Sequence, residues 1–244
     1  MIETEALETT IKVCNLGIWQ DSEVLSYCRE RGLSDAIIRD WRLGAFPEDP
    51  NQLYSLSTQI NNSRYSSYSI LRLTDGYFES SFLKNRLIIP VEDTYGGSMA
   101  IMGRAVLPAE VCKQYDFPKY YNTHYPKTRA LFGLSRALST VMRTREIVLV
   151  EGNLDVITAH QYGLRNVVAT SSSSISTHQI SLAARYADRI FLALDGDEAG
   201  QAGIARAMDK HAAAARQLGV ELIPMYFQDG KDLDEALRAG GIKW

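Results

Sequence analysis

The last hundred residues of the chain alternate short apolar runs with stretches of helical periodicity. The first apolar run is β-branched and ends at Glu151-Gly152, and the intervening stretches repeat apolar positions every three to four residues. Strands are predicted at 146–150, 166–170, 189–194 and 221–227, and helices at 153–163, 176–187, 199–218 and 232–239. Strands that alternate with helices form right-handed βαβ units, so this half predicts an α/β domain with a mostly parallel sheet.

The first 145 residues follow a different pattern. Two helical segments within 22–41 flank an Arg-Gly-Leu-Ser break, and Ser34 is placed to cap the second one. Two apolar runs on either side of Tyr95-Gly96-Gly97 predict a β-hairpin, and the Asn-, Ser- and Tyr-rich residues 50–69 predict a loop. The mixture indicates an α+β subdomain ahead of the α/β domain.

Acidic residues gather where the predicted parallel strands end. Glu151 follows the first strand, Asp195 follows the third, and Asp232 and Asp234 come shortly after the fourth. The carboxyl ends of parallel strands meet at one edge of a sheet, which is where such folds bind ligands. Any one of these carboxylates is explained by a helix N-terminus, where it contributes about 0.3–1 kcal/mol.

The four together need a different explanation. Two unit charges about 4 Å apart repel by roughly 4 kcal/mol at an effective dielectric of 20. A divalent cation removes that repulsion, and Mg²⁺ is typically held by one or two carboxylates together with substrate phosphates. The sequence therefore predicts a site for Mg²⁺ or Mn²⁺ at this edge.

Charge and composition narrow the function further. Residues 84–145 hold ten basic and four acidic residues, a net charge of +6, whereas the segments before and after carry −5 and −4. A basic segment is either a solvated surface or a binding region for a phosphate-bearing partner. The three cysteines and four histidines have no ligand-like spacing, so no zinc is expected in this chain.

The chain is 45% hydrophobic, with an acidic, polar N-terminus and no apolar run near the roughly 18 residues of a membrane span. We therefore expect a cytoplasmic protein without a membrane partner.

Two motifs of the C-terminal half resemble the Toprim domain. EGNLDV (151–156) is similar to its glutamate motif and DGDEAG (195–200) is similar to its Asp-x-Asp motif, each at the end of a predicted strand and in the same order. Toprim domains occur in DnaG-type primases, topoisomerases, nucleases and recombination-repair proteins, so the N-terminal half has to distinguish among them.

The N-terminal half resembles the DnaG-type primases. YCRERGLSDAIIRDWRLGAFP (27–47), NRLIIPVEDTYGGSMAIMGRAVL (85–107) and the segment FPKYYNT to ALFGL (117–134) are similar to three motifs of that family. The resemblance covers about residues 22–240 and implies the RNA-polymerising core of a primase. It divides the chain into a lead segment (1–21), an N-terminal basic α+β subdomain (22–143) and a Rossmann-like Toprim catalytic domain (144–244).

The resemblance also implies roles for individual residues. Catalytic metal binding falls to Glu151, Asp195 and Asp197, with Asp155, Asp232 and Asp234 completing the acidic site. Contacts to nucleic acid and nucleoside triphosphates fall to Arg31, Arg86, Arg104, Lys119 and Asn122. The implied reaction is the synthesis of short RNA primers on single-stranded DNA, with ribonucleoside triphosphates as substrates and the nascent RNA as product. A replicative helicase and a separate zinc-binding module for template recognition are further implied partners.

Three departures from the family qualify this expectation. The family has a glycine where this chain has Ser172, so the serine must avoid positive φ or accept strain. The zinc-binding domain that precedes the core in full-length primases, and the helical and helicase-binding segments that follow it, have no counterpart in these 244 residues.

Other functions use parts of the same pattern. A Toprim nuclease would employ the same carboxylates with water in place of the RNA hydroxyl, and a nucleic-acid-binding module could keep the site without turnover. A topoisomerase needs a nucleophilic tyrosine in a further domain, for which the chain has no room.

Overall fold

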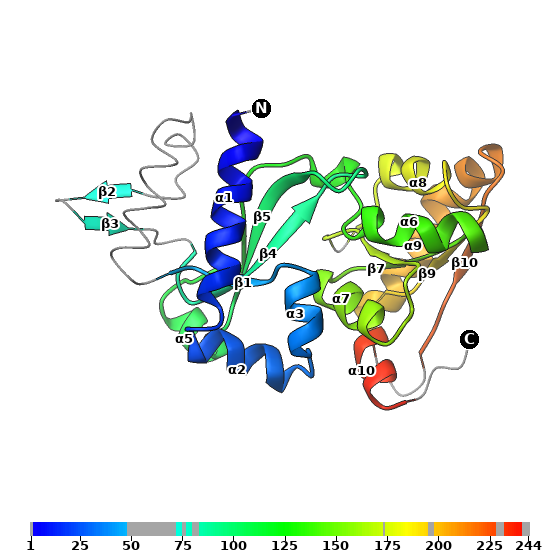
Figure 1. The fold of residues 1–244 in the computed structure, drawn as a ribbon. Helices are drawn as coiled ribbons and strands as arrows, with labels where there is room; N and C mark the ends of the chain where they lie inside the picture. Colours follow the sequence, from blue (N-terminus) through cyan, green and yellow to red (C-terminus); the bar gives the residue numbers. More distant parts are fainter. Residues whose placement is uncertain are drawn as a thin grey trace. The chain divides into compact units, whose positions relative to one another are not determined.

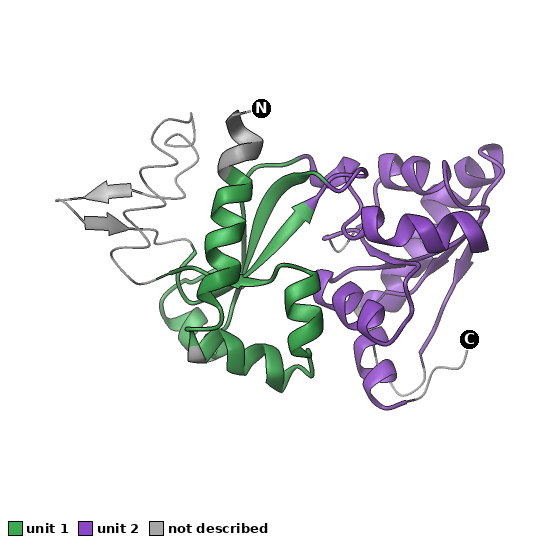
Figure 2. Ribbon diagram, viewed as in Figure 1, with its two compact units in different colours: residues 1–91, 97–125 green, residues 92–96, 126–244 purple. Residues whose placement is uncertain are grey.

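The computed structural model describes residues 2–47, 72–74, 77–79, 83–172, 174–194, 198–227 and 232–240. The chain forms two compact units, which Figure 2 shows in separate colours. Unit 1 comprises residues 1–91 and 97–125, and unit 2 comprises residues 92–96 and 126–244. Within the described residues, no helix is long and apolar enough to cross a membrane.

Unit 1 combines helices with a four-stranded sheet of order β1-β4-β5-β6 (Figure 1). Its helices are α1 (Ile2–Gly17), α2 (Ser22–Glu30), α3 (Asp35–Asp40) and α5 (Ala109–Gln114). Its sheet strands are β1 (Gly44–Ala45), β4 (Arg86–Glu92), β5 (Ser98–Ala105) and β6 (Tyr120–Asn122), and β2 (Arg72–Thr74) pairs separately with β3 (Tyr77–Glu79). The predicted hairpin is confirmed by β4 and β5, and Ser34 caps α3 by accepting a hydrogen bond from the backbone N–H of Ile37. The predicted loop 50–69 lies outside the described residues.

Helix α1 packs directly on the sheet because glycine leaves room for it. A Cβ at Gly44 of β1 would lie 2.6 Å from the carbonyl carbon of Cys14, and one at Gly17 would lie 2.8 Å from the carbonyl oxygen of Ala45. Leu7, Ile11 and Cys14 of α1 are buried in a cluster with apolar residues of β4 and β5. Residues 1–21, expected as a lead segment, therefore contribute a helix to the core of unit 1.

Unit 2 is built on a parallel sheet of order β10-β9-β7-β8, in agreement with the predicted α/β class. The strands are β7 (Glu146–Val150), β8 (Val167–Ala169), β9 (Arg189–Leu192) and β10 (Glu221–Pro224). The helices are α6 (Leu134–Thr144), α7 (Asn153–Gln161), α8 (Thr177–Ala183), α9 (Glu198–Gln217) and α10 (Leu233–Arg238), and η2 (Lys127–Arg129) is a 3₁₀ turn.

Both faces of this sheet are covered, which explains the continuous apolar run of β7. Ile147 and Leu149 lie in one core cluster with residues of α6, α8 and α9. Val148 and Val150, which point to the opposite face, are also buried. Helices α7 and α10 pack against each other, and α7 also packs against β8 (Figure 1).

The division between the units falls earlier than the expected boundary at residues 143 and 144. Leu134, Ala137 and Val141 of α6 are buried in the same cluster as β7 and β9, so α6 belongs to the core of unit 2. Compactness thus places residues 126–143 with the parallel sheet.

Candidate active site and nucleic-acid interface

Glu151 and Asp155 lie at one strand-to-helix turn of unit 2. Strand β7 ends at Val150, Gly152 is the N-cap of α7, and Asp155 is in the first turn of that helix. A Cβ at Gly152 would lie 2.5 Å from Oδ2 of Asp155, so the carboxylate packs against the backbone next to Glu151. The structure therefore brings these two predicted residues together at the carboxyl end of the sheet.

Strand β9 runs beside β7 toward the same edge. Leu149 pairs with Leu192, and the backbone N–H of Ala193 donates to the carbonyl of Leu149 at 2.9 Å. Leu194 is the last described residue before α9, so Asp195 and Asp197 lie outside the described residues.

The two predicted carboxylates near α10 have identifiable structural partners. Oδ1 of Asp232 caps α10 by accepting a hydrogen bond from the backbone N–H of Glu235 at 2.7 Å. Asp234 is buried and forms an ion pair with Arg238 on the next turn of the helix. Among the described residues, no cluster of three or more acidic, histidine or cysteine side chains is gathered for a metal.

The loop after β8 resolves the question about Ser172. The residue with positive φ is Ser171, at 56°, whereas Ser172 is not in the left-handed region. The Ser171 hydroxyl donates to Oδ1 of the buried Asn153 at 2.7 Å, which ties this loop to the first residue of α7. The serine that replaces the family's glycine therefore needs no left-handed backbone here.

Arg86 of unit 1 is the most deeply buried of the predicted cationic residues, with 2% of its surface exposed. Its guanidinium stacks over the Phe117 ring at 3.9 Å and donates from Nη1 to the carbonyl of Pro118 at 2.7 Å. Desolvation by burial lowers the pKa of Arg86 from its ordinary value. Within the described part of the chain it forms no salt bridge, so no described carboxylate pairs with this buried positive charge.

Arg31, Arg104 and Lys119 surround two tyrosines of the same unit. Arg31 and Arg104 both lie over the Tyr27 ring at 5.8 Å, and Arg104 and Lys119 lie over the Tyr120 ring at 5.1 and 6.0 Å. A pocket of about 490 Å³ opens beside them, lined by Arg104, Lys113, Phe117 and Lys119 among others. Such stacking holds flexible cations in place.

Asn122 lies on β6 opposite Met102, one step along the ladder from the pair formed by Gly103 and Tyr121. Its Oδ1 is buried, as are Nε of Arg86 and Nε of Arg104, and none of these three atoms has a hydrogen-bond partner among the described residues. Buried polar atoms without partners are rare in native proteins and often mark functional positions.

Lys127 and Arg129 were not among the residues that the sequence predicted for the site. They lie on η2, and the chain that follows pairs Phe132 with Ala169 at the end of β8. The turn therefore belongs to the same edge of the parallel sheet as Glu151. The signal was present as two basic residues in PKTR, but sequence alone did not show that this segment joins unit 2.

Comparison with known proteins now decides the family. The model described as "DNA primase catalytic core, N-terminal domain" matches residues 13–138, more than half of the chain. This chain belongs to the DnaG-type primase family. A Toprim-like model matches residues 148–237, the region of the parallel sheet.

Individual primases agree with this assignment. The DNA primase of Aquifex aeolicus is 26% identical over 238 residues, which cover 94% of this chain and 46% of that protein. A crystal structure of the zinc-binding and RNA polymerase domains of the A. aeolicus primase has a TM-score of 0.84 at 26% identity, covering 97% of this chain and 57% of that one. A structure of a DnaG primase catalytic domain bound to single-stranded DNA shares the fold, with a TM-score of 0.80 at 23% identity, over 98% of this chain and 77% of that one. The chain spans less than half the length of the A. aeolicus primase that it matches.

Proposed function

We propose that this chain is the RNA polymerase core of a primase, which synthesises short RNA primers on single-stranded DNA by metal-dependent nucleotidyl transfer. The observation that carries the proposal is the turn from β7 into α7. It presents Glu151 at the carboxyl end of a parallel strand, with Asp155 packed against the adjacent backbone at Gly152. In the proposed division of labour, residues 22–143 bind nucleic acid and residues 144–244 form the catalytic domain.

The donor atoms at this edge fit a divalent cation. Continuing the register that pairs Leu149 with Leu192 sets Leu194 level with Glu151, and Asp195 is the next residue in the chain. Neighbouring strands are about 4.8 Å apart, a spacing that supports a shared ion for carboxylates that follow both strands. Carboxylate oxygens are the ligands that Mg²⁺ and Mn²⁺ prefer.

We assign the ion to Glu151, Asp195 and Asp197, with Asp155 completing the acidic site. When bound, it supplies positive charge to the reacting phosphates and favours deprotonation of the RNA 3′-hydroxyl. The cap and the ion pair at α10 favour a supporting role for Asp232 and Asp234, in which they stabilise α10, the helix that packs against α7.

The cations supply the complementary half of the reaction. Arg31, Arg104 and Lys119, held on Tyr27 and Tyr120, bind the phosphates of template and nucleotide in this proposal. The pocket lined by Arg104, Lys113 and Lys119 favours an anionic ligand for this region. Lys127 and Arg129 add positive charge at the carboxyl edge of unit 2. Asn122 contributes a polar contact of the same kind.

Further partners follow from the same proposal. The A. aeolicus structure combines its RNA polymerase domain with a zinc-binding domain, and we propose that a separate module of that kind selects the template for this chain. A replicative helicase would bring the template strand to it.

The test is a synthesis assay with single-stranded DNA, Mg²⁺ or Mn²⁺ and labelled ribonucleoside triphosphates. We expect labelled products that lengthen with time in the wild type and are lost in Asp195→Ala, while the thermal unfolding midpoint of the variant stays near that of the wild type. Undiminished synthesis by Asp195→Ala would remove the site assignment. Shortening of the template without new product would instead identify a nuclease.

A further inference from the structure

Gln179 of α8 is buried, with 1% of its surface exposed, although it lies in the first turn of a short helix. Its side chain takes part in a capping box with Ser176. The hydroxyl of Ser176 accepts from the backbone N–H of Gln179 at 3.1 Å, and Oε1 of Gln179 accepts from the backbone N–H of Ser176 at 3.0 Å. The acceptor half of the carboxamide therefore serves the helix itself.

The donor half reaches three carbonyl oxygens in two other segments of the chain. Nε2 of Gln179 lies 3.1 Å from the carbonyl oxygen of Lys127, 2.9 Å from that of Ala130 and 3.0 Å from that of Thr170. Ser176 adds a bond from its hydroxyl to the carbonyl of Thr128 at 2.5 Å. The start of α8 is therefore hydrogen-bonded to residues 127–130, which include η2, and also to Thr170, which directly follows β8.

This set of bonds is more than a helix cap requires. A capping box needs only an acceptor at this position, which a glutamate supplies equally well. The amide donors instead fix the turn that carries Lys127 and Arg129. The residue after Thr170 bonds to α7 through Asn153, and the N–H of Thr170 itself donates to Val150, the residue before Glu151.

We propose that Gln179 is a positioning residue, which locks the basic turn 127–129 to the carboxyl edge of the parallel sheet so that its cations meet the nucleotide phosphates beside Glu151. This inference rests on the proposed function for its catalytic consequence, although not for the structural one. Partial burial, which lowers the pKa of Lys127, agrees with a turn held against the protein rather than free in solvent.

The discriminating variant is Gln179→Glu. It is close in shape and keeps the acceptor for the N–H of Ser176, but it cannot donate to the three carbonyl oxygens when ionised. We expect the KM for ribonucleoside triphosphates to rise roughly tenfold, the equivalent of about one hydrogen bond, with a smaller change in kcat. Gln179→Met removes the donors without introducing a charge and should raise KM in the same way. It tests the proposal even if the buried carboxylate of Gln179→Glu prevents folding.

Ile180→Val is the matched control, because Ile180 is the next residue of α8 and is buried in the core of unit 2. It should lower the thermal midpoint without changing KM, since the bonds to η2 remain. If Gln179→Glu and Gln179→Met lose stability but keep the wild-type KM, as this control does, Gln179 has only a structural role and the proposal is overturned.

A second readout does not depend on activity. Trypsin cleaves after lysine and arginine, so cleavage after Lys127 and Arg129 reports the release of the turn. We expect it to be about tenfold faster in both Gln179 variants, as local opening becomes easier, with cleavage after Arg143 as an internal reference. Unchanged cleavage at the turn would refute the lock. If the wild type makes no primers, the proposed function fails, and the trypsin rates alone then decide whether Gln179 holds the turn.

Discussion

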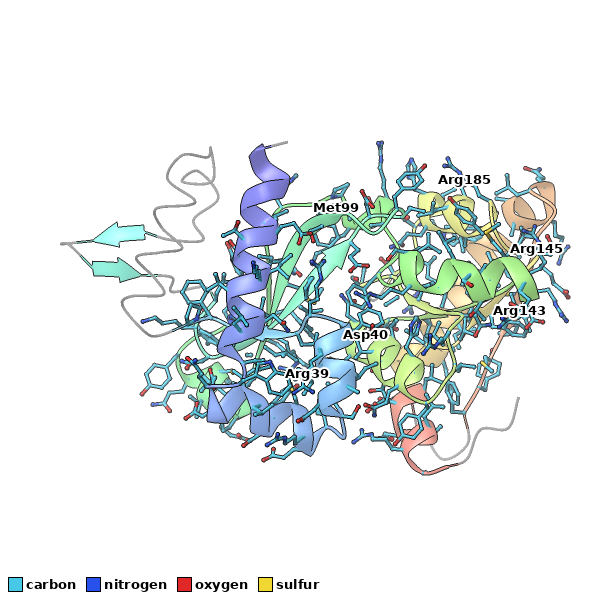
Figure 3. The ribbon with its side chains drawn as sticks, viewed as in Figure 1. Arg39, Asp40, Met99, Arg143, Arg145 and Arg185 are labelled. Carbon is cyan, nitrogen blue, oxygen red and sulfur yellow. The ribbon has the colours of Figure 1, made fainter. Side chains whose placement is uncertain are left out.

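Acidic residues are found at both edges of the parallel sheet in unit 2, but their surroundings differ between the two edges. At the amino ends, Glu146 of β7 forms an ion pair with Arg189, and Asp188 before β9 forms one with Arg145 at 2.7 Å. Arg145 lies at the end of α6 (Figure 3). At the carboxyl ends, Glu151 and Asp155 are gathered at a helix N-terminus, and Asp195 and Asp197 follow β9 in the chain.

This difference distinguishes carboxylates in surface ion pairs from carboxylates in a candidate metal site. A carboxylate beside an exposed arginine is already compensated, and such pairs contribute little to stability. Carboxylates that bind one divalent cation are instead compensated by the ion, and the carboxyl edge of a parallel sheet is where such folds bind ligands. Substitutions of acidic residues at the amino edge therefore serve as controls for substitutions of acidic residues at the carboxyl edge.

The largest contrast is expected between Glu151→Gln and Glu146→Gln. The first removes a proposed metal ligand and should reduce primer synthesis by about 100-fold or more, as loss of a transition-state charge contact does. The second removes only the ion pair with Arg189 and should leave synthesis within about twofold, because exposed pairs are weak. Rates of nucleotide incorporation measure the effects of both substitutions. Equal losses of activity would contradict the proposed difference between the two edges.

A smaller effect is expected from Gly152→Ala. The backbone at Gly152 (φ −91°, ψ 139°) suits alanine, but the new Cβ would lie 2.5 Å from Oδ2 of Asp155 and displace that carboxylate. We expect synthesis to fall roughly tenfold, the scale of a positioning defect, with little change in the thermal midpoint. Gly203→Ala on helix α9 is the control. Its Cβ would lie 3.3 Å from the Leu194 side chain, and the variant should retain activity. Full activity of Gly152→Ala would mean that the place of Asp155 is unimportant.

The smallest effect is expected from loss of the ion pair between Asp188 and Arg145 at the amino edge, and a change of pH makes this effect measurable. Hydrogen bonding from Arg145 lowers the pKa of Asp188 below its ordinary value of 3.8. A lowered carboxyl pKa contributes stability above the ordinary value and loses it as the pH falls through the lowered one. Asp188→Asn should therefore melt slightly below the wild type at pH 7, and the two midpoints should converge well below pH 3.8. A difference that persists at low pH would point to a cause other than charge.

Much of unit 2 was predictable because its local signals agree with its tertiary structure. The apolar run 146–150, the helix after Gly152 and the cap at Ser176 were all expected from sequence and are confirmed. Strand order was not, because periodicity shows that β7 is buried on both faces without showing that β9 and β8 flank it.

The charged residues show where sequence reasoning stops. The sequence implied a nucleic-acid contact for Arg86 without indicating its burial against Phe117, which depends on contacts between distant segments. The ion pair of Asp234 with Arg238 spans one helical turn, but the burial of Asp234 depends on tertiary packing. The metal role of Glu151, Asp195 and Asp197 stays a prediction, with the last two outside the described residues.

The most direct test of the central claim is Mn²⁺ binding followed by electron paramagnetic resonance in the wild type, Glu151→Gln and Glu146→Gln. The account predicts that the wild type and Glu146→Gln bind the ion alike, whereas Glu151→Gln binds it at least about tenfold more weakly, as expected for a lost carboxylate ligand. Equal affinity in all three proteins would show that the carboxyl edge is not the metal site.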